Sequence, residues 1–278
     1  MNKYSLLEIS NYINGSLYGS DKLVASFSID SRTIEDEDVF FCIKGKNYDG
    51  HDFIKDSLKK ASCIITSKDI KNINLNEKSY IKVNDTLQAL QKTSEYVRNK
   101  SAAKFIAITG SNGKTTVKEM LAHVLSDYKI TYTKGNLNNH IGVPLTLLSM
   151  NQDEDFVIVE IGSNNIGEIE PLSKIVNPDV AAVTNIGYAH IEGFKTLKNT
   201  AKEKYSIFKN IKKNGFAIIN NDYKYKENIK RTNKIYFGYS ENIYIKIYKV
   251  IKNIFYKTFF LTISKSKKNH FNIKYKSK

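Results

Sequence analysis

The 278-residue chain has no tryptophan, three prolines and two cysteines, and few of its 43 basic residues are arginines. Two cysteines are too few for a disulfide scaffold, so an apolar core has to hold the fold. No run reaches the roughly 18 uninterrupted apolar residues of a membrane span. The N-terminal segment carries Glu8 where a secretory signal has an apolar centre. We therefore expect a cytoplasmic chain with no signal peptide and no membrane insertion.

The scarcity of arginine also bears on the formal net charge of +15. Arg32, Arg98 and Arg231 are the three arginines. Proteins that bind nucleic acid favour the bidentate contacts that arginine makes with phosphates and bases. Residues 239–278 hold ten lysines and one acid, so much of the excess lies in one segment. We interpret the charge as solvated lysine faces and expect no nucleic-acid partner.

Hydrophobic residues make up 41% of the chain, enough to bury a core and to exclude a wholly disordered protein. The length suits one large domain or two ordinary ones. Apolar runs and spacings in residues 1–84 predict short alternating elements. These are helices at 5–13 and 53–61 and strands at 39–43, 63–65 and 80–83. Cys42 and Cys63 lie in the apolar runs and are interpreted as core residues.

A capping pattern, Asp85-Thr86-Leu87-Gln88, predicts a helix that ends near Asn99 and leads to a domain boundary near residue 100. Beyond it, strand, loop and helix patterns repeat, which favours a parallel α/β sheet. The expected strands are 105–108, 156–159, 180–183 and 216–219, with a helix at 117–126. Alternation in 243–263 predicts an antiparallel ribbon, and the Lys-rich chain from Ser264 is expected to be loose.

The strongest motif is Thr109-Gly110-Ser111-Asn112-Gly113-Lys114-Thr115-Thr116. It lies between an expected strand and an expected helix, as a phosphate-binding loop does. Glycines allow backbone amides to turn toward phosphate oxygens, Lys114 supplies positive charge, and the Thr115 hydroxyl suits Mg²⁺. Ile108 stands where the general motif has its first glycine. We predict that residues 110–116 bind a nucleotide's phosphates.

Two further segments follow expected strands and so point to the same edge of the sheet. Glu160 ends one strand and could hold Mg²⁺, although a strand-end acid is often unremarkable. The segment from Thr184 to His190 follows the next strand. His190 could ligate a metal, or could be an ordinary structural histidine. For Glu160 and for His190, the residue type alone does not decide between a metal ligand and an ordinary structural residue.

Two other segments are weak when they are considered alone. The stretch that contains Lys202, Glu203 and Lys204 has the pattern of a solvated helix face. Asp30-Ser31-Arg32 and the later Asp49-Gly50-His51 fit simple turn chemistry. Their spacing gives no reason to assign catalysis or binding to them.

Together these segments resemble the Mur ligases, ATP-dependent enzymes that build the peptidoglycan stem peptide by forming amide bonds. The resemblance covers residues 5 to about 240 and includes the phosphate loop without its first glycine. Lys118-Glu119-Met120, the stretch from Gly135 to Thr146, and Glu160 through Ile169 resemble the last ligase of the series. The Ser-Ser-His that typically follows the glutamate in the preceding ligase is absent.

The resemblance implies a role for each matched residue. Lys114, His190 and Lys204 would be catalytic. ATP would be bound by Gly110, Ser111, Asn112, Gly113, Lys114, Thr115 and Thr116. Ser31, Arg32, Asn138 and Asn139 would bind substrate, and two Mg²⁺ ions would be held by Thr115, Glu160, His190 and a carbamylated Lys204. Ser206 departs from the glutamate that relatives often have, which alters the charge around Lys204.

The resemblance also implies substrates, fold and organisation. The substrates would be UDP-N-acetylmuramoyl-tripeptide and D-alanyl-D-alanine, joined by a monomer through an acyl phosphate. Residues 1–84 would form an α/β uridine-nucleotide domain, 85–100 a helical linker, 101–240 the central ATPase domain with a mostly parallel sheet, and 241–278 the end of that domain. The family's Gly-x-His-Asn segment and third, Rossmann-like domain are not found, so we expect that this chain alone does not ligate.

Three alternatives stay open at this point. The chain could be a nucleotide-binding remnant without turnover, or another amide-forming ligase such as a folylpolyglutamate synthetase. Asp30-Ser31-Arg32 and the segment from Asp49 to Phe53 resemble the uridine-nucleotide domain of the Mur ligases, which argues against the synthetase. A basic nucleic-acid binder is the third, and the salt dependence of binding would test it.

Overall fold

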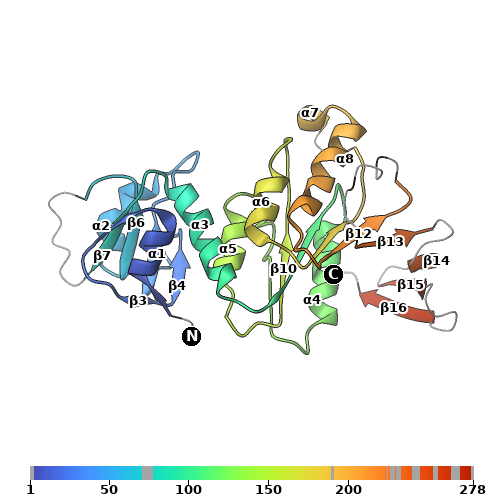
Figure 1. The fold of residues 1–278 in the computed structure, drawn as a ribbon, viewed down its shortest axis with the longest axis horizontal. Coiled ribbons are helices and arrows are strands. Elements are labelled where there is room, and N and C mark those ends of the chain that lie inside the picture. The colour runs from blue at the N-terminus through green and yellow to red at the C-terminus, as the bar shows by residue number, and fades with distance from the viewer. Residues whose placement is uncertain are drawn as a thin grey trace. The chain divides into compact units, whose positions relative to one another are not determined.

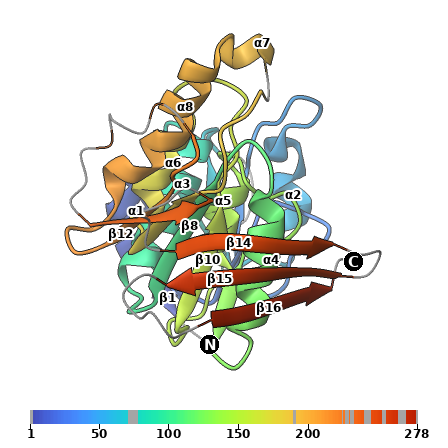
Figure 2. The same ribbon diagram turned by 90° about the vertical axis from the view of Figure 1, so that its right-hand side faces the viewer.

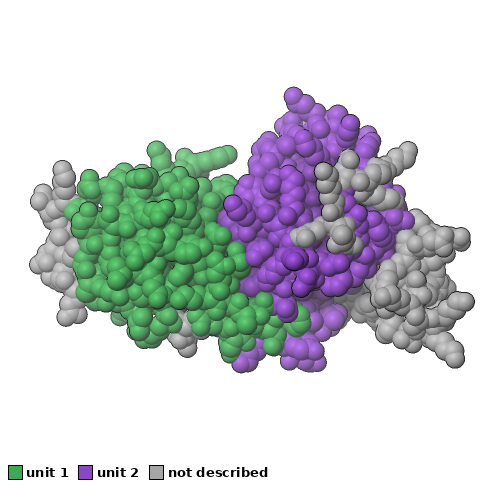
Figure 3. Space-filling view, viewed as in Figure 1, with its two compact units in different colours: residues 1–103, 140–157 green, residues 104–139, 158–278 purple. Residues whose placement is uncertain are grey.

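A computed structural model of the chain (Figure 1) describes residues 3–70, 78–188, 191–223, 225, 229, 233–239, 245–252, 256–263 and 270–276. The chain divides into two compact units (Figure 3). Unit 1 comprises residues 1–103 and 140–157, and unit 2 comprises residues 104–139 and 158–278. The functional boundaries expected near residues 84, 100 and 240 stay predictions.

Unit 1 contains a five-stranded sheet with the strand order β2-β7-β6-β5-β4. Strands β4 to β7 pair in parallel, and β2 is antiparallel to β7. A separate pair joins β1 and β3. The bounds are β1 (Tyr4–Ser5), β2 (Ser16–Tyr18), β3 (Leu23–Val24), β4 (Ser26–Ser28), β5 (Asp38–Phe41), β6 (Cys63–Thr66) and β7 (Ser79–Lys82).

The helices of unit 1 are α1 (Leu6–Ile13), η1 (Gly50–Phe53), α2 (Ile54–Ser57), α3 (Thr86–Asn99) and α5 (Gly142–Leu148). Helix α3 begins where the sequence predicts, because the Asp85 carboxylate accepts a hydrogen bond from the Gln88 amide at 2.9 Å. Both α1 and α5 pack against α3.

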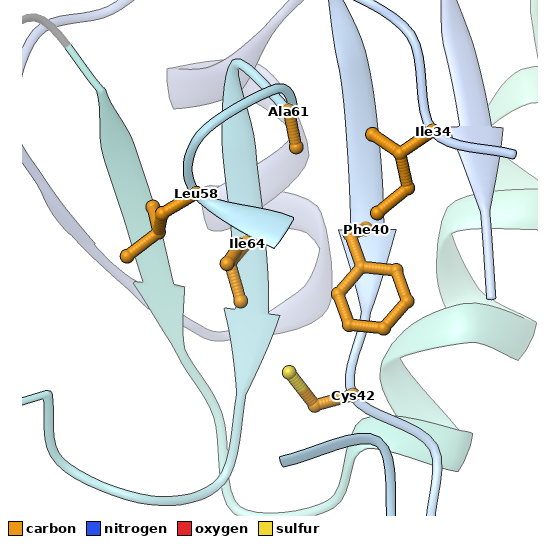
Figure 4. Close-up of a cluster of buried hydrophobic side chains, with 6 residues drawn as sticks. All are labelled: Ile34, Phe40, Cys42, Leu58, Ala61 and Ile64. Atoms are coloured by element: carbon orange, nitrogen blue, oxygen red, sulfur yellow. The ribbon is translucent and has the colours of Figure 1, made fainter. Parts of the chain in front are cut away.

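The helix expected at 53–61 is wrong in length. Its α-helical part is α2 alone, four residues long, and the chain then tightens into turns. Lys59 and Lys60 make hydrogen bonds to carbonyls three residues back instead of four. The apolar spacing was a correct guide to burial, because Leu58 and Ala61 join a core with Ile34, Phe40, Cys42 and Ile64 (Figure 4).

Unit 2 is built on a nine-stranded sheet with the order β16-β15-β14-β13-β12-β11-β8-β10-β9. The pairs from β8 through β11, β12 and β13 to β14 are parallel, so the mostly parallel α/β sheet is confirmed. The bounds are β8 (Lys104–Thr109), β9 (Ile130–Tyr132), β10 (Phe156–Glu160), β11 (Val180–Val183), β12 (Phe216–Asn220), β13 (Lys234–Gly238), β14 (Ile245–Lys252), β15 (Tyr256–Ile263) and β16 (His270–Lys276).

The helices of unit 2 are α4 (Lys114–Val124), α6 (Ile169–Val176), α7 (Ile191–Phe194), α8 (Leu197–Tyr205) and η2 (Ser206–Asn210). Helix α4 packs on one face of the sheet, where Ala122 meets Ile108 and Ile158. Side chains alternate along a strand, so Phe105 faces the other side, where α6 packs against β8.

Two expectations for unit 2 are corrected. Helix α4 begins at Lys114, three residues before the expected Val117, because Gly113 ends the loop with a left-handed φ of 77°. The chain after Ser264 was expected to be loose, but β16 pairs with β15 in antiparallel register. Its alternating Phe271, Ile273 and Tyr275 suit a strand. The antiparallel ribbon of β14 and β15 is confirmed, and Figure 2 shows it beside β16.

Candidate active site at the phosphate loop

The loop between β8 and α4 brings a lysine and a helix N-terminus together. Gly113 has no side chain that could cap α4, and no side-chain cap from the described residues binds the first amides of the helix. Lys114 Nζ folds back and donates to the carbonyl of Gly110 at 2.9 Å. Burial lowers the pKa of Lys114, and the nearby Glu160 opposes that shift. The start of α4 therefore combines uncapped helix amides, the positive end of the helix dipole and the Lys114 ammonium. Such a combination is a binding site for an anion.

The segment after β11 fastens this loop. The Ser111 amide donates to the Asn185 carbonyl at 3.1 Å, and the Asn112 amide donates to Asn185 Oδ1 at 2.8 Å. The Gly187 amide donates to Ser111 Oγ at 2.9 Å. The predicted convergence of the two strand ends is therefore confirmed for Thr184 to Gly187. His190 and Ala189 lie outside the described residues.

Gly110 lies where no larger residue fits. Its φ is 153°, and a Cβ atom there would come within 1.9 Å of Thr184 Oγ1. The Thr184 hydroxyl in turn donates to the Asn112 carbonyl at 2.6 Å. The close approach of the two segments explains why this position needs a glycine.

Glu160, the last residue of β10, is 1% exposed and is bound at both carboxylate oxygens. Thr115 Oγ1 donates to Oε2 at 2.9 Å, and Asn138 Nδ2 donates to Oε1 at 2.8 Å. Both donors are neutral, and no described lysine or arginine forms an ion pair with this carboxylate. Burial of a carboxylate is costly unless a cation compensates for it.

The donor set at this position fits Mg²⁺. A hydroxyl and a carboxylate are hard oxygen ligands, and Mg²⁺ is commonly held by one or two carboxylates together with phosphates and water. Thr115 and Glu160 would be these ligands. Among the described residues there is no cluster of three or more histidine, cysteine, aspartate or glutamate side chains that could form an all-protein metal cage.

A buried lysine supports the segment that carries Asn138. Lys118, on α4, has no exposed surface, and its Nζ donates to the Thr133 carbonyl at 2.7 Å. Thr133 Oγ1 accepts a hydrogen bond from the Glu160 amide at 3.0 Å. Lys118 therefore connects α4 to Thr133, which binds the Glu160 amide and lies in the segment that leads to Asn138. Its sequence, a lysine in an ordinary helix, gives no signal of this role.

Lys204, on α8, is 1% exposed, and its Nζ donates to Ser163 Oγ at 2.9 Å. Desolvation lowers the pKa of Lys204 to about 8, and the charge of Lys114 adds to the effect. An amine with this pKa is partly neutral near neutral pH. The solvated helix face suggested by the lysine-rich sequence is therefore wrong at this position.

In unit 1 the predicted turn at the end of β4 contains an exposed ion pair as well as backbone hydrogen bonds. The Arg32 guanidinium donates to both carboxylate oxygens of Asp30, at 2.9 and 2.6 Å. Hydrogen bonds from Arg32 lower the pKa of Asp30 to about 2. The Arg32 side chain remains 85% exposed, and Ser31 is half-buried.

The structure brings together several residues that the sequence analysis singled out, and it shows contacts that the sequence analysis missed. Within unit 2 the structure brings together the loop from Gly110 to Thr116, Glu160, Asn138 and the chain from Thr184. Asn138 bonds to Glu160, and Asn139, next to it, is exposed. The role of Asn185 as a clamp was missed, and only its position after a strand could have suggested it.

No described helix is long and apolar enough to cross a membrane.

Comparisons with known proteins agree with this geometry. The Mur ligase middle domain matches residues 108–277, and the catalytic domain of the Mur ligase family matches residues 24–111. The UDP-N-acetylmuramoyl-tripeptide–D-alanyl-D-alanine ligase of Buchnera aphidicola is 40% identical over 246 residues, which are 86% of this chain and 53% of that protein. The enzyme of the same name from Escherichia coli is 38% identical over 78% of this chain and 48% of its own length.

Solved structures give the same result. Crystal structure I of MurF from Acinetobacter baumannii has a TM-score of 0.88 and 28% identity, over 99% of this chain and 61% of its own. MurF ligase from Thermotoga maritima in complex with ADP has a TM-score of 0.79 and 29% identity, over 90% of this chain and 58% of its own. The chain thus spans about half the length of the curated relatives that it matches. The chain belongs to the Mur ligase family.

Proposed function

We propose that this chain carries the uridine-nucleotide and ATP-phosphate sites of a ligase that joins D-alanyl-D-alanine to UDP-N-acetylmuramoyl-tripeptide, with ATP as the energy source. The relatives at 38% and 40% identity bear that name, and the Thermotoga maritima relative was solved with ADP. The observation that carries the proposal is the hydrogen bond that the Thr115 hydroxyl donates to the buried Glu160 carboxylate. Thr115 directly follows Lys114 in the loop.

In this proposal the phosphate loop holds ATP. The amides at the start of α4 and the Lys114 ammonium would take the terminal phosphates. To do so, Lys114 exchanges its bond to the Gly110 carbonyl for phosphate oxygens. Thr115 and Glu160 would hold Mg²⁺, which when bound withdraws charge from the phosphate oxygens. Contributions from His190 and a second ion belong to the same proposal.

The proposed ligation then proceeds in two steps, formation of an acyl phosphate and formation of the amide. The terminal carboxylate of the tripeptide attacks the γ-phosphorus of ATP, which forms an acyl phosphate and releases ADP. The amine of D-alanyl-D-alanine attacks the acyl carbon, the new amide forms, and inorganic phosphate leaves as the amine loses its proton. Both steps bring anions together, so the positive charge of Lys114 stabilises them.

Lys204 would act as a carbamate in this scheme. Only a neutral amine can attack CO₂, and the pKa of about 8 leaves part of the Lys204 amine neutral. Ser163 Oγ lies 2.9 Å from Nζ and could donate to the new carboxylate. That group would be an anion that can bind a second Mg²⁺. Ser31, Arg32 and Asn139 would contact the UDP-substrate, and the chain would act as a cytoplasmic monomer.

Binding and turnover test the proposal separately. Titration calorimetry of the 278-residue chain with Mg²⁺·ADP and with UDP-N-acetylmuramoyl-tripeptide should give binding to both. Lys114→Ala should weaken ADP binding about 10-fold or more, because it removes a charged donor. Lys213→Ala, at an exposed lysine of the same unit, is the control. If the chain binds neither nucleotide, the proposal is wrong. Turnover is assayed separately with Mg²⁺·ATP, UDP-N-acetylmuramoyl-tripeptide and D-alanyl-D-alanine together, and binding without phosphate release in that mixture supports a module without turnover.

A further inference from the structure

Helix α8 sends two neighbouring charged side chains into the interior. Glu203 is 2% exposed and Lys204 is 1% exposed. Their hydrogen bonds go to different points of one loop, residues 161–168, which joins Glu160 to helix α6. Lys204 reaches Ser163 in the first half of the loop. Glu203 reaches its far end.

The Glu203 carboxylate binds three successive backbone amides. Oε2 accepts from the Gly167 amide at 2.7 Å, and Oε1 accepts from Glu168 at 3.1 Å and from Ile169 at 2.8 Å. These amides are at the N-terminus of α6, where the neighbouring Glu168 makes no side-chain cap of its own. A carboxylate at this end of a helix satisfies unpaired amides and interacts favourably with the helix dipole. Glu203 is thus the cap of α6, supplied from another helix.

The loop is fixed at its other end as well. The Gly162 amide donates to the Asn138 carbonyl at 2.8 Å, close to where the same residue's side chain holds Glu160. Between the two ends, Gly167 has a φ of 96°, a left-handed conformation that turns the chain toward Glu203. Ser163 lies between these two anchors, next to Gly162, and faces Lys204 with both of them in place. The place of the Lys204 amine in the site therefore depends on the cap.

We propose that Glu203 is a positioning residue. Its carboxylate holds loop 161–168 against α8, so that Ser163 faces the Lys204 amine and the amine stays buried. The significance for catalysis rests on the proposed function, in which Lys204 takes part. The hydrogen bonds themselves do not depend on it.

The test compares Glu203→Gln with Glu170→Gln in the 278-residue chain. Glutamine keeps the size of the side chain but has one acceptor oxygen for three amides, and its NH₂ group opposes them. Glu170 is an acid on the first turn of the same helix, and its carboxylate pairs with Lys209 at the surface. Hydrogen exchange at residues 167–169 and acetylation of Lys204 by an N-hydroxysuccinimide ester are read out by mass spectrometry.

We expect Glu203→Gln to speed exchange at residues 167–169 about 10-fold or more, through loss of the cap. Lys204 should become acetylated in this variant, whereas it stays protected in wild type and in Glu170→Gln. Glu203→Asp keeps the charge on a shorter side chain and should give exchange and acetylation between those of wild type and Glu203→Gln. It replaces the glutamine variant in the test if that variant does not fold. Exchange and acetylation at wild-type levels in both Glu203 variants would overturn the proposal. Neither readout needs nucleotide, so a chain that does not bind ADP removes the proposed function and leaves this test intact.

Discussion

The side-chain amide of Asn138 donates to Oε1 of Glu160 at 2.8 Å, and so takes the carboxylate oxygen that Thr115 leaves free. Asn138→Asp would place a second carboxylate against this buried one. We expect the free energy of unfolding in EDTA to fall by about 1–3 kcal/mol. Mg²⁺ should recover part of the loss, because a cation between the two acids removes their repulsion. Thermal unfolding with and without Mg²⁺ measures both effects, with Asn136→Asp, at an exposed neighbour, as control. A loss of stability that does not respond to Mg²⁺ would contradict this account of the site.

Gly110→Ala should disrupt the phosphate loop, because the new methyl group would collide with Thr184 Oγ1. We expect a loss of about 1–3 kcal/mol in stability and weaker ADP binding. Adding Thr184→Ala removes the obstructing hydroxyl and should restore part of both quantities. Gly135→Ala is a matched control, since Gly135 also has a positive φ, 54°, but no atom within 4 Å of a built Cβ. A double variant no better than Gly110→Ala would show that the collision is not the cause.

Lys118→Met should lower the free energy of unfolding by about 2–4 kcal/mol, because it removes the buried ammonium that donates to the Thr133 carbonyl. The same change should weaken Mg²⁺·ADP binding, since Thr133 also accepts from the Glu160 amide. Chemical denaturation and calorimetry provide the two measurements. Lys202→Met, at an exposed helical lysine of the same unit, should change each by far less. Equal effects from the two variants would argue against the carbonyl contact.

Asp179 should make stability depend on pH. Desolvation raises its pKa, but hydrogen bonds from Lys212 and the Phe105 amide and the charges of nearby lysines outweigh this and give a net lowering from 3.8. The unfolded state therefore binds the proton more readily. The stabilisation from the Asp179 carboxylate is complete above about pH 5 and is lost as the pH falls through the lower folded pKa. Asp179→Asn should cost about 1–2 kcal/mol at pH 7, and the two proteins should converge in acid. A pH-independent difference between the unfolding curves would rule out this linkage.

Much of the site could be predicted because its parts follow strands. The loop after β8, Glu160 at the end of β10 and Thr184 after β11 converge since parallel strands present their carboxyl ends at one edge. The cap of α3 was equally readable, because Asp85 and Gln88 are local in sequence. These inferences needed only periodicity and neighbouring residues.

Other features depend on tertiary pairing that no local pattern contains. Lys118 reads as one more helical lysine, and only the position of Thr133 makes it a buried donor. Glu203 reads as part of a charged helix face, although it caps a helix more than thirty residues away. The end of the expected helix at 53–61 was misjudged because turns bury Leu58 and Ala61 as well as a helix would.

The bonds between Gly187 and Ser111 couple the chain after β11 to the phosphate loop. The next residue, Tyr188, is 72% exposed, so its ring is open to solvent at the edge of that loop. Because the chain has no tryptophan, an indole placed at position 188 would be the sole emitter under excitation at wavelengths that tyrosine does not absorb. Rearrangement of the phosphate loop would then be followed optically, in real time, from a single fluorophore.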